Sequence, residues 1–347
     1  MRVGCKYGSH RVVEPKGVLP QPAWRIDNTM EIYDNEILID VKMLNIDAAS
    51  FSQMEKEANG DPARIGEIVM KTVKERGKQH NPVTGSGGML IGAVEAVGSL
   101  LAGKIDLKPG DRIATLVSLS LTPLRIDRIK AVHMESDQVE IEGKAILFES
   151  GIYAKLPSDL PESLALALLD VAGAPAQTAK LVKPGDTVLI IGGGGKSGLL
   201  CLHEARKHAG VTGKVIVIGH SNASCERARE LGLADVVVQA DAGKPLEVLE
   251  KVKEATGGQL ADLTINCVNI PGTEMASILA TKDNGTIYFF SMATSFTAAA
   301  LGAEGVGKDV TMLIGNGYTR GHAEVALQTI RENPKLRQMF EKLFVQP

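Results

Sequence analysis

Apolar positions follow two different patterns on either side of residue 157. On the N-terminal side they form short runs between glycine- and proline-containing turns, a pattern typical of strands. One segment differs, because residues 61–77 (DPARIGEIVMKTVKERG) repeat apolar side chains at helical spacing behind Asp61 and Pro62, which predicts a helix with Asp61 as N-cap. The predicted strands cover 36–47 (EILIDVKMLNID), 88–99 (GMLIGAVEAVGS) and 107–119 (LKPGDRIATLVSL).

After residue 157, apolar β-rich runs alternate with helical stretches. Such repeated strand–helix units build a parallel, doubly wound sheet. The chain therefore predicts an α/β protein in which a strand-rich domain precedes a Rossmann domain, with a final helical segment over 322–343. The runs cover 186–192, 213–219, 234–240, 261–268 and 285–291, and the helices between them cover 197–210, 222–232, 246–257 and 272–285.

A glycine-rich loop follows the first of these runs, in the sequence VLIIGGGGKSG (188–198). A P-loop (GxxxxGK[ST]) would need glycine at position 190, where Ile190 stands, so we do not expect an ATP site. The dinucleotide pattern GxGxxG fits Gly193, Gly195 and Gly198, or one residue earlier with Ser197 at its end. Strand before and helix after are the context that this pattern needs. The candidate cofactor-binding residues of the loop are Gly192, Gly193, Gly194, Gly195, Lys196, Ser197 and Gly198.

The choice between NAD and NADP is normally made at the end of the second strand, where an acid holds the ribose hydroxyls of NAD. Here that strand ends in Gly219-His220-Ser221-Asn222, without an acid. These residues and Arg227 have groups that can hydrogen-bond a 2′-phosphate, but they are equally ordinary helix-capping residues beside NAD, so both cofactors stay open. Further cofactor contacts are expected at two strand tips, from Cys267, Val268, Asn269, Ser291 and Met292.

Composition excludes several classes of partner. A formal net charge of −3 offers no basic face for nucleic acid, and no segment approaches the roughly 18 consecutive apolar residues of a membrane span. The four cysteines form no CxxC pair, so neither a disulfide framework nor a structural zinc site is expected. Residues 1–6 (MRVGCK) lack the apolar core of a secretory signal, so we expect a cytoplasmic protein.

The strand-rich first part and the segment 155–198 (KLPSDLPESLALALLDVAGAPAQTAKLVKPGDTVLIIGGGGKSG) resemble the medium-chain dehydrogenase/reductase superfamily. The resemblance implies a GroES-like substrate domain over 1–160, completed by helices of 310–347, and an NAD(P)-binding Rossmann domain over 161–309. Zinc-dependent members carry a cysteine shortly after the strand EILIDVKMLN (36–45) and a GHE-type histidine before the next Gly-x-Val. This chain has Asp47 and Gly87-Gly88-Met89 there, so we expect no metal.

More narrowly, residues 75–92 (ERGKQHNPVTGSGGMLIG), 121–127 (LTPLRID) and the helical insert resemble the L-erythro-3,5-diaminohexanoate dehydrogenase family. The resemblance implies oxidative deamination of 3,5-diaminohexanoate to 5-amino-3-oxohexanoate and ammonia with NAD or NADP, in lysine fermentation. The expected partners are therefore the small diamino acid and a second copy of the chain in a homodimer.

That reaction needs a base, because hydride leaves carbon only after the adjacent ammonium has lost a proton. Asp47 is the leading candidate, as base or as ammonium anchor, although a turn-capping role explains it equally well. Ser50 lies one turn onward and is expected to orient substrate or water. A polar loop before Gly87 contributes further candidates, and the substrate carboxylate needs a cation. The loop candidates are His80, Asn81, Thr84 and Ser86, and the cations are Arg76, Lys78 and Arg125.

Two alternatives remain open at this level. A zinc-free quinone or enoyl-thioester reductase of the same superfamily would share the cofactor site but need no charged substrate pocket. A nucleotide-binding protein without redox chemistry would share only the glycine loop. Nicotinamide reduction with a panel of substrates distinguishes all three.

Overall fold

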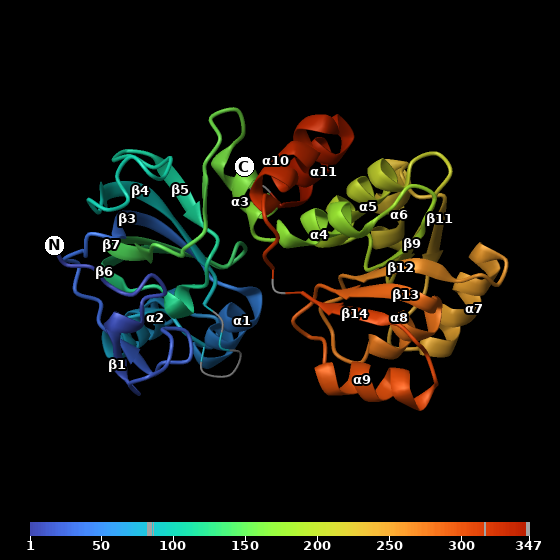
Figure 1. Cartoon of the computed structure of the whole chain (residues 1–347), viewed down its shortest axis with the longest axis horizontal. Coiled ribbons are helices and arrows are strands. Elements are labelled where there is room, and N and C mark those ends of the chain that lie inside the picture. The colour runs from blue at the N-terminus through green and yellow to red at the C-terminus, as the bar shows by residue number, and fades with distance from the viewer. Residues whose placement is uncertain (82–84, 86, 316, 345–347) are drawn as a thin grey trace. The chain divides into compact units, whose positions relative to one another are not determined.

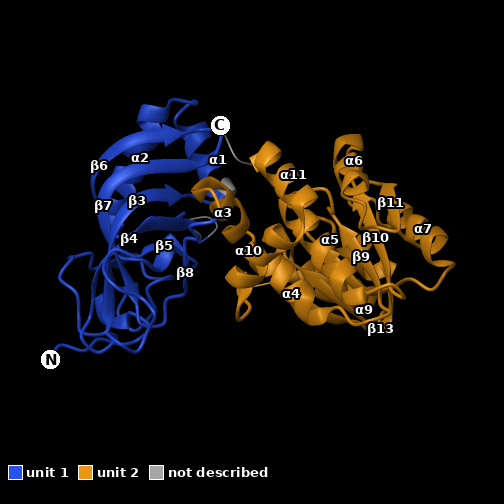
Figure 2. Ribbon diagram, turned by 90° about the horizontal axis from the view of Figure 1, so that it is seen from above, with its two compact units in different colours: residues 1–159 blue, residues 160–347 orange. Residues whose placement is uncertain are grey.

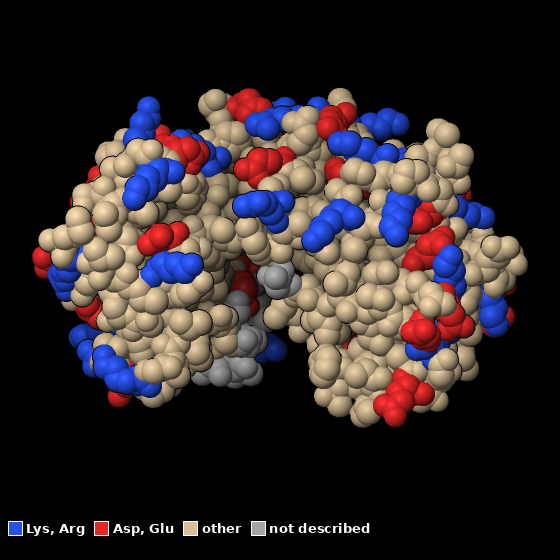
Figure 3. Space-filling model, in the orientation of Figure 1, with Lys and Arg blue, Asp and Glu red and all other residues tan. Residues whose placement is uncertain are grey.

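The computed structural model describes residues 1–81, 85, 87–315 and 317–344. The chain divides into two compact units, residues 1–159 and residues 160–347 (Figure 2). Within the described residues no helix is long and apolar enough to cross a membrane. On the face drawn in Figure 3, Lys and Arg are interspersed with Asp and Glu on both units.

The first unit is built on a six-stranded antiparallel sheet in the order β6-β7-β3-β4-β5-β8. The central strand β3 pairs with β7 on one side and β4 on the other, so its apolar residues Ile37, Ile39 and Val41 lie in the core. A short pair, β1 and β2, stands apart from this sheet. The strands are β1 (Val12–Glu14), β2 (Arg25–Ile26), β3 (Glu36–Asn45), β4 (Met89–Val97), β5 (Arg112–Thr115), β6 (Leu124–His133), β7 (Gln138–Phe148) and β8 (Tyr153–Lys155).

Two helices, α1 (Ala48–Glu57) and α2 (Pro62–Arg76), connect β3 to the segment that leads into β4. The predicted helix is confirmed as α2, which has Pro62 in its first turn and Asp61 accepting from the backbone N–H of Ala63. The apolar spacing predicts one helix here, whereas the structure has two, with Asp47 as the N-cap of α1. Short 3₁₀ turns occupy Ser9–Arg11 and Leu119–Leu121.

The second unit contains a parallel sheet in the order β11-β10-β9-β12-β13-β14. The predicted α/β class with a Rossmann sheet is confirmed, and the order reverses at β9, the strand that precedes the glycine loop. The five predicted strands are present, and β14 is a sixth that the sequence analysis did not predict. The strands are β9 (Thr187–Ile191), β10 (Lys214–Gly219), β11 (Val236–Gln239), β12 (Ala261–Asn266), β13 (Thr281–Phe289) and β14 (Thr311–Ile314).

Helices cover both faces of this sheet, with α5 and α6 on one face and α7 and α8 on the other (Figure 1). The predicted helix over 272–285 is wrong over residues 281–285, because α8 ends at Ala280 and β13 begins at once with Thr281. The helices are α3 (Glu162–Leu169), α4 (Gly173–Leu181), α5 (Lys196–Ala209), α6 (Asn222–Leu231), α7 (Pro245–Thr256), α8 (Glu274–Ala280), α9 (Phe296–Gly305), α10 (His322–Glu332) and α11 (Pro334–Phe344).

The C-terminal helices α10 and α11 pack within the second unit, against α3, and α10 also packs against α4 and α5. Pro334 separates them, because proline cannot continue the hydrogen bonding of α10. That residues 310–347 complete the first domain stays a prediction.

Candidate active site

Asp47 and Ser50 form the first part of the candidate site, at the point where β3 gives way to α1. The Asp47 carboxylate accepts the backbone N–H of Ser50 at 3.0 Å and the Ser50 hydroxyl at 2.5 Å. Asn81 extends this hydrogen-bond network, since its Nδ2 donates to Ser50 Oγ at 2.9 Å. Ser50 and Asn81 are buried, whereas Asp47 is partly exposed. The Ser50 hydroxyl therefore accepts a hydrogen bond from Asn81 and donates one to Asp47.

The paired glycines that precede β4 bring the chain close to this turn. Gly88 has a φ of +87°, and a Cβ there would overlap the carbonyl oxygen of Asn45. Only glycine adopts that backbone conformation without strain at such a close approach. The glycine therefore lets the start of β4 pack directly against the end of β3, beside Asp47.

Arg76 and His80 form a second part of the site. Arg76 ends α2, its guanidinium lies 3.9 Å from the ring centroid of Trp24, and its Nη1 contacts His80 Nδ1 at 2.7 Å. Burial, together with the positive charges of Lys78 and Arg76, lowers the pKa of His80 to about 4. The imidazole is neutral at neutral pH, so its Nδ1 accepts from Arg76. A histidine with so low a pKa is a poor base for an ammonium.

The two other cations proposed for the substrate carboxylate lie elsewhere. Lys78 is fully buried and donates to the carbonyl oxygens of Pro20 and Gln21 at 2.6 and 2.9 Å, and burial lowers its pKa to about 8. Arg125 lies on the exposed side of β6 in an ion pair with Asp127 at 3.0 Å. The structure thus brings Asp47, Ser50 and Asn81 together in one network and joins Arg76 to His80, while Thr84 and Ser86 lie outside the described residues.

A pocket of about 210 Å³ lies between α1 and α2, entirely within the first unit. Both groups reach it, because Ser50 and Asn81 of the first and Arg76 and His80 of the second line its wall. The pocket therefore joins a hydroxyl bound to a carboxylate with a guanidinium. Several residues of the wall were not candidates in the sequence, namely Gln53, Met54, Glu57, Ile68, Lys71, Thr72, Glu75 and Gln79. Gln79 lies between the candidates Lys78 and His80 but carries no charge.

The glycine loop of the second unit has the shape that a pyrophosphate needs. A Cβ at Gly198 would overlap Gly192 and one at Gly194 would overlap the carbonyl of Ser224, so both positions exclude a side chain. At Gly195 the nearest atom lies 3.5 Å away, which leaves the loop open at the start of α5. Gly195 is the N-cap of α5 and no side chain caps it. The first N–H groups of α5 therefore remain available for an anion, and the close packing at Gly198 favours the Gly193/Gly195/Gly198 spacing.

Two side chains beside the loop have protein partners. Lys196 pairs with Asp170 at 2.6 Å, and Arg227 donates from Nε to the carbonyl of Gly194 at 2.8 Å. Ser221 caps α6 in a capping box with Ser224, and His220 and Asn222 are exposed beside it. Arg227 thus supports the loop from below, while the end of β10 presents polar groups to solvent.

The other cofactor candidates follow β12 and β13. Ser291 Oγ lies 3.3 Å from Asn269 Oδ1, so the two loops are hydrogen-bonded to each other. Met292 is 86% exposed, whereas Cys267 Sγ lies 3.9 Å from Cys201 Sγ, and this contact and burial raise the pKa of the Cys267 thiol. Val268 Cγ2 approaches the position of a Cβ on Gly192, which places this loop beside the glycine loop. A thiol with a raised pKa is not a nucleophile at neutral pH.

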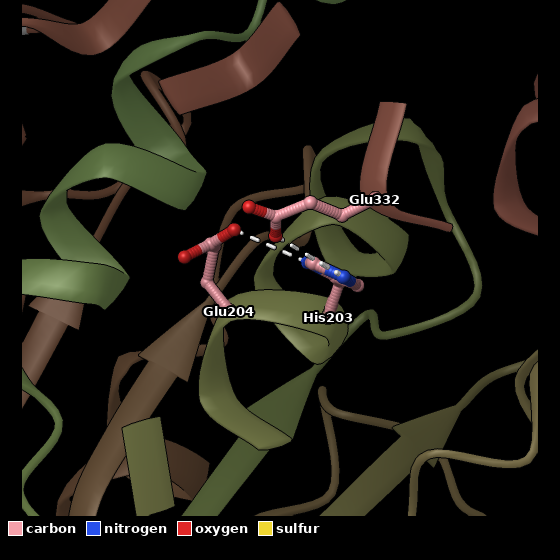
Figure 4. Close-up of side chains that lie close together, drawn as sticks. All are labelled: His203, Glu204 and Glu332. Atoms are coloured by element: carbon pink, nitrogen blue, oxygen red, sulfur yellow. Dashed lines mark hydrogen bonds and ion pairs between the residues drawn. The ribbon is translucent and has the colours of Figure 1, made fainter. Parts of the chain in front are cut away.

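A cluster of His203, Glu204 and Glu332 was not found by sequence reasoning (Figure 4). It joins α5 to α10, with His203 Nδ1 3.1 Å from Glu204 Oε1 and Nε2 3.9 Å from Glu332 Oε2. Lys207 also pairs with Glu332 at 2.8 Å, and Thr329 donates to Glu204 at 3.2 Å. These hydrogen bonds and ion pairs already satisfy the carboxylates, so the cluster links α5 to α10.

Comparison with known proteins defines the class and then the family. The N-terminal domain model of L-erythro-3,5-diaminohexanoate dehydrogenase matches residues 10–157, and a model described as zinc-binding dehydrogenase matches residues 198–322. A mycobacterial protein solved in complex with NADPH is 18% identical, covers 90% of this chain and 82% of its own, and superposes with a TM-score of 0.54. The fold is that of the medium-chain dehydrogenases/reductases.

Two curated relatives are far more similar. The L-erythro-3,5-diaminohexanoate dehydrogenase of Acetoanaerobium sticklandii is 62% identical over 99% of both chains. The protein of the same name from Fusobacterium nucleatum is 59% identical over 99% of this chain and 100% of its own. The chain belongs to the L-erythro-3,5-diaminohexanoate dehydrogenase family.

Proposed function

We propose that this chain catalyses the NAD(P)-dependent oxidative deamination of L-erythro-3,5-diaminohexanoate. The observation that carries the proposal is identity near 60% with two dehydrogenases of that name over almost the whole chain. In the balanced reaction the C3 amine, water and NAD(P)⁺ give 5-amino-3-oxohexanoate, ammonia, NAD(P)H and a proton. When bound at the glycine loop, NAD(P)⁺ would supply the hydride acceptor, and the residues of this chain would supply binding and proton transfer.

Asp47 is the base in this proposal. The C3 ammonium gives its proton to the Asp47 carboxylate, directly or through the Ser50 hydroxyl that already donates to it. Asn81 supports the relay because its N–H donates to Ser50 Oγ and keeps the serine proton directed at Asp47. Asp47 then releases this proton to solvent, and after hydride has left, the regenerated carboxylate takes a proton from the water that attacks the iminium carbon and returns it to the departing amine.

Arg76 is the carboxylate anchor. Of the three candidate cations, Lys78 is bound to backbone carbonyls and Arg125 to Asp127, whereas Arg76 lines the pocket beside Ser50. Among the residues that the structure describes, Arg76 has no ion pair with a carboxylate, and burial lowers its pKa. A partly desolvated guanidinium of this kind binds a carboxylate in bidentate geometry.

The cofactor lies at the glycine loop in this proposal, with the pyrophosphate on the open side of Gly195 and the first N–H groups of α5. His220, Ser221 and Asn222, at the end of β10, would hold the adenosine ribose. We also propose that the protein is cytoplasmic and that the reaction is metal-independent. The second point is supported by Asp47 and Gly88, which stand where the zinc-dependent members of the superfamily carry ligands. Exhaustive chelation should leave turnover unchanged, and a loss that zinc alone restores would contradict this.

A homodimer is supported by the edge of the parallel sheet. Within the described residues, strand β14 pairs with β13 alone, and its Ile314 is 47% exposed. Helix α9, which shares an apolar cluster with Met312 of β14, exposes Phe296 (71%) and Leu301 (62%). An unpaired apolar edge is protected when a second copy covers it. Ile314→Lys should shift the mass measured by light scattering towards the monomer. Val211→Lys, at a fully exposed valine, is the control and should leave the mass unchanged.

The activity is tested by nicotinamide reduction with a panel of substrates. We expect NAD(P)H formation with 3,5-diaminohexanoate and release of ammonia in equal amount. Activity only with a quinone or an enoyl thioester would assign the chain to the reductases of the same fold. Cofactor binding without turnover of any of these compounds would make it a nucleotide-binding protein.

A further inference from the structure

One polar side-chain atom of the residues that line the α1–α2 pocket is unsatisfied. Gln79 is only 2% exposed and lines this pocket, and its Oε1 is buried without a donor among the residues that the structure describes. A buried amide oxygen in that state costs free energy that a suitable donor recovers. Because the unsatisfied acceptor belongs to a residue of the pocket wall, it indicates the chemistry of a group that the pocket could hold once the amide turns towards it.

The chain reaches this position through the end of α2. Gly77 is the C-cap with a φ of +73°, and its N–H bonds to the carbonyl of Val73. This left-handed residue turns the chain so that Arg76 and Gln79 both line the same pocket, three positions apart. The pocket thus has a cation and an acceptor in one wall.

Charged side chains around the pocket make a positively charged donor acceptable. Glu57 of α1 and Glu75 of α2 line it together with Lys71 and Arg76, so its charges balance. In 3,5-diaminohexanoate the carboxylate and the C5 ammonium each stand two carbons from the reacting C3. A pocket that recognises both ends needs a cation for one and an acceptor for the other, and Arg76 and Gln79 provide that pair.

We propose that Gln79 Oε1 binds the C5 ammonium of the substrate in the α1–α2 pocket, with Glu57 and Glu75 supplying negative potential. The inference rests on the proposed function and adds the group that selects a diamino acid over a β-amino acid with one amine. Gln79 acts only in binding, because the proton transfers take place at Asp47.

The test compares 3,5-diaminohexanoate with 3-aminohexanoate, which lacks the C5 amine. The ratio of their kcat/KM values, or of their inhibition constants if the second compound is not oxidised, measures recognition of that amine alone. Gln79→Leu should lower this ratio by about tenfold to a hundredfold, the range expected for one charge-assisted hydrogen bond. Gln259→Leu, at an exposed glutamine of the second unit, is the matched control and should leave the ratio unchanged.

A second variant guards against simple misfolding. Gln79→Glu keeps an acceptor at the same place, so it should keep or raise the preference for the diamino acid. The proposal is overturned if Gln79→Leu lowers activity with both compounds equally, if it leaves the ratio unchanged, or if Gln79→Glu loses the preference. Wild-type protein that does not oxidise 3,5-diaminohexanoate would instead overturn the proposed function.

Discussion

The hydroxyl of Ser50 donates to Asp47 at 2.5 Å, and the same carboxylate accepts the backbone N–H of Ser50 at 3.0 Å. One side chain therefore caps α1 and holds a serine proton. The two roles depend on different properties of the side chain, because capping needs only an oxygen acceptor whereas proton transfer needs a titratable group. They can therefore be separated by a single substitution.

Asp47→Asn keeps the cap, since asparagine is as good an N-cap as aspartate. If Asp47 is the base, turnover should fall by roughly 10²–10⁴-fold while cofactor affinity and melting temperature stay near wild type. Steady-state kinetics and a thermal melt measure this. Asp61→Asn, the same change at the N-cap of α2, should leave turnover intact. If Asp47→Asn instead raises KM at constant kcat, the residue anchors an ammonium and is not the base.

Arg76→Gln removes the guanidinium that lines the pocket. We expect KM for the diamino acid to rise about tenfold to a hundredfold, because a hydrogen bond to a charged group contributes about 1.5–3 kcal/mol, while kcat changes less. Arg125→Gln is the matched control, since that arginine is exposed and paired with Asp127. Equal kinetics for wild type and Arg76→Gln would remove Arg76 from the substrate site.

Much of the fold follows from the sequence, but the pocket does not. The parallel sheet was predictable because β9, β10 and β12 are buried on both faces and read as continuous apolar runs. The sequence also contains a pattern that predicts helix α1, although it was overlooked. Phe51, Met54 and Ala58 recur at helical spacing after Asp47.

The sequence of strand β6, which was not predicted, has a less regular apolar–polar alternation. Its pairing with β7 shifts register between Ile126 and Arg128 and again between Ile129 and Ala131, which breaks the apolar–polar alternation. The pocket depends on the packing of α1 beside α2. The contact of His203 with Glu332 joins residues far apart in the chain. No local pattern reports either arrangement.

The lowered pKa of His80 predicts a pH dependence of stability. The folded chain holds this ring neutral down to about pH 4, whereas the unfolded chain protonates it near 6.5, so the unfolded state binds more protons in that window. The free energy of unfolding should fall as pH falls from 6.5 to about 4. The loss should stay below the roughly 3 kcal/mol of a complete shift, because the ring is partly exposed.

His80→Asn keeps an acceptor for Arg76 near the position of Nδ1 and cannot titrate. Urea unfolding at several pH values should therefore show a flatter profile between pH 6.5 and 4 for His80→Asn than for wild type. His220→Asn, at an exposed histidine of the second unit, should leave the slope unchanged. Identical slopes for wild type and His80→Asn would show that the ring titrates normally in the folded chain.

Two glycines of the cofactor loop should respond differently to an added side chain. Gly195 has ordinary extended backbone angles and its nearest neighbour for a Cβ lies at 3.5 Å, so Gly195→Val should fold normally. Its side chain would occupy the open side of the loop, and NADPH affinity should fall at least about tenfold because the pyrophosphate can no longer approach the N–H groups of α5.

Gly198→Ala places its methyl against the backbone of Gly192, so it should lower the melting temperature as well. Fluorescence titration with NADPH and a thermal melt separate the two effects. Unchanged NADPH affinity in Gly195→Val would mean that the pyrophosphate does not bind at this loop.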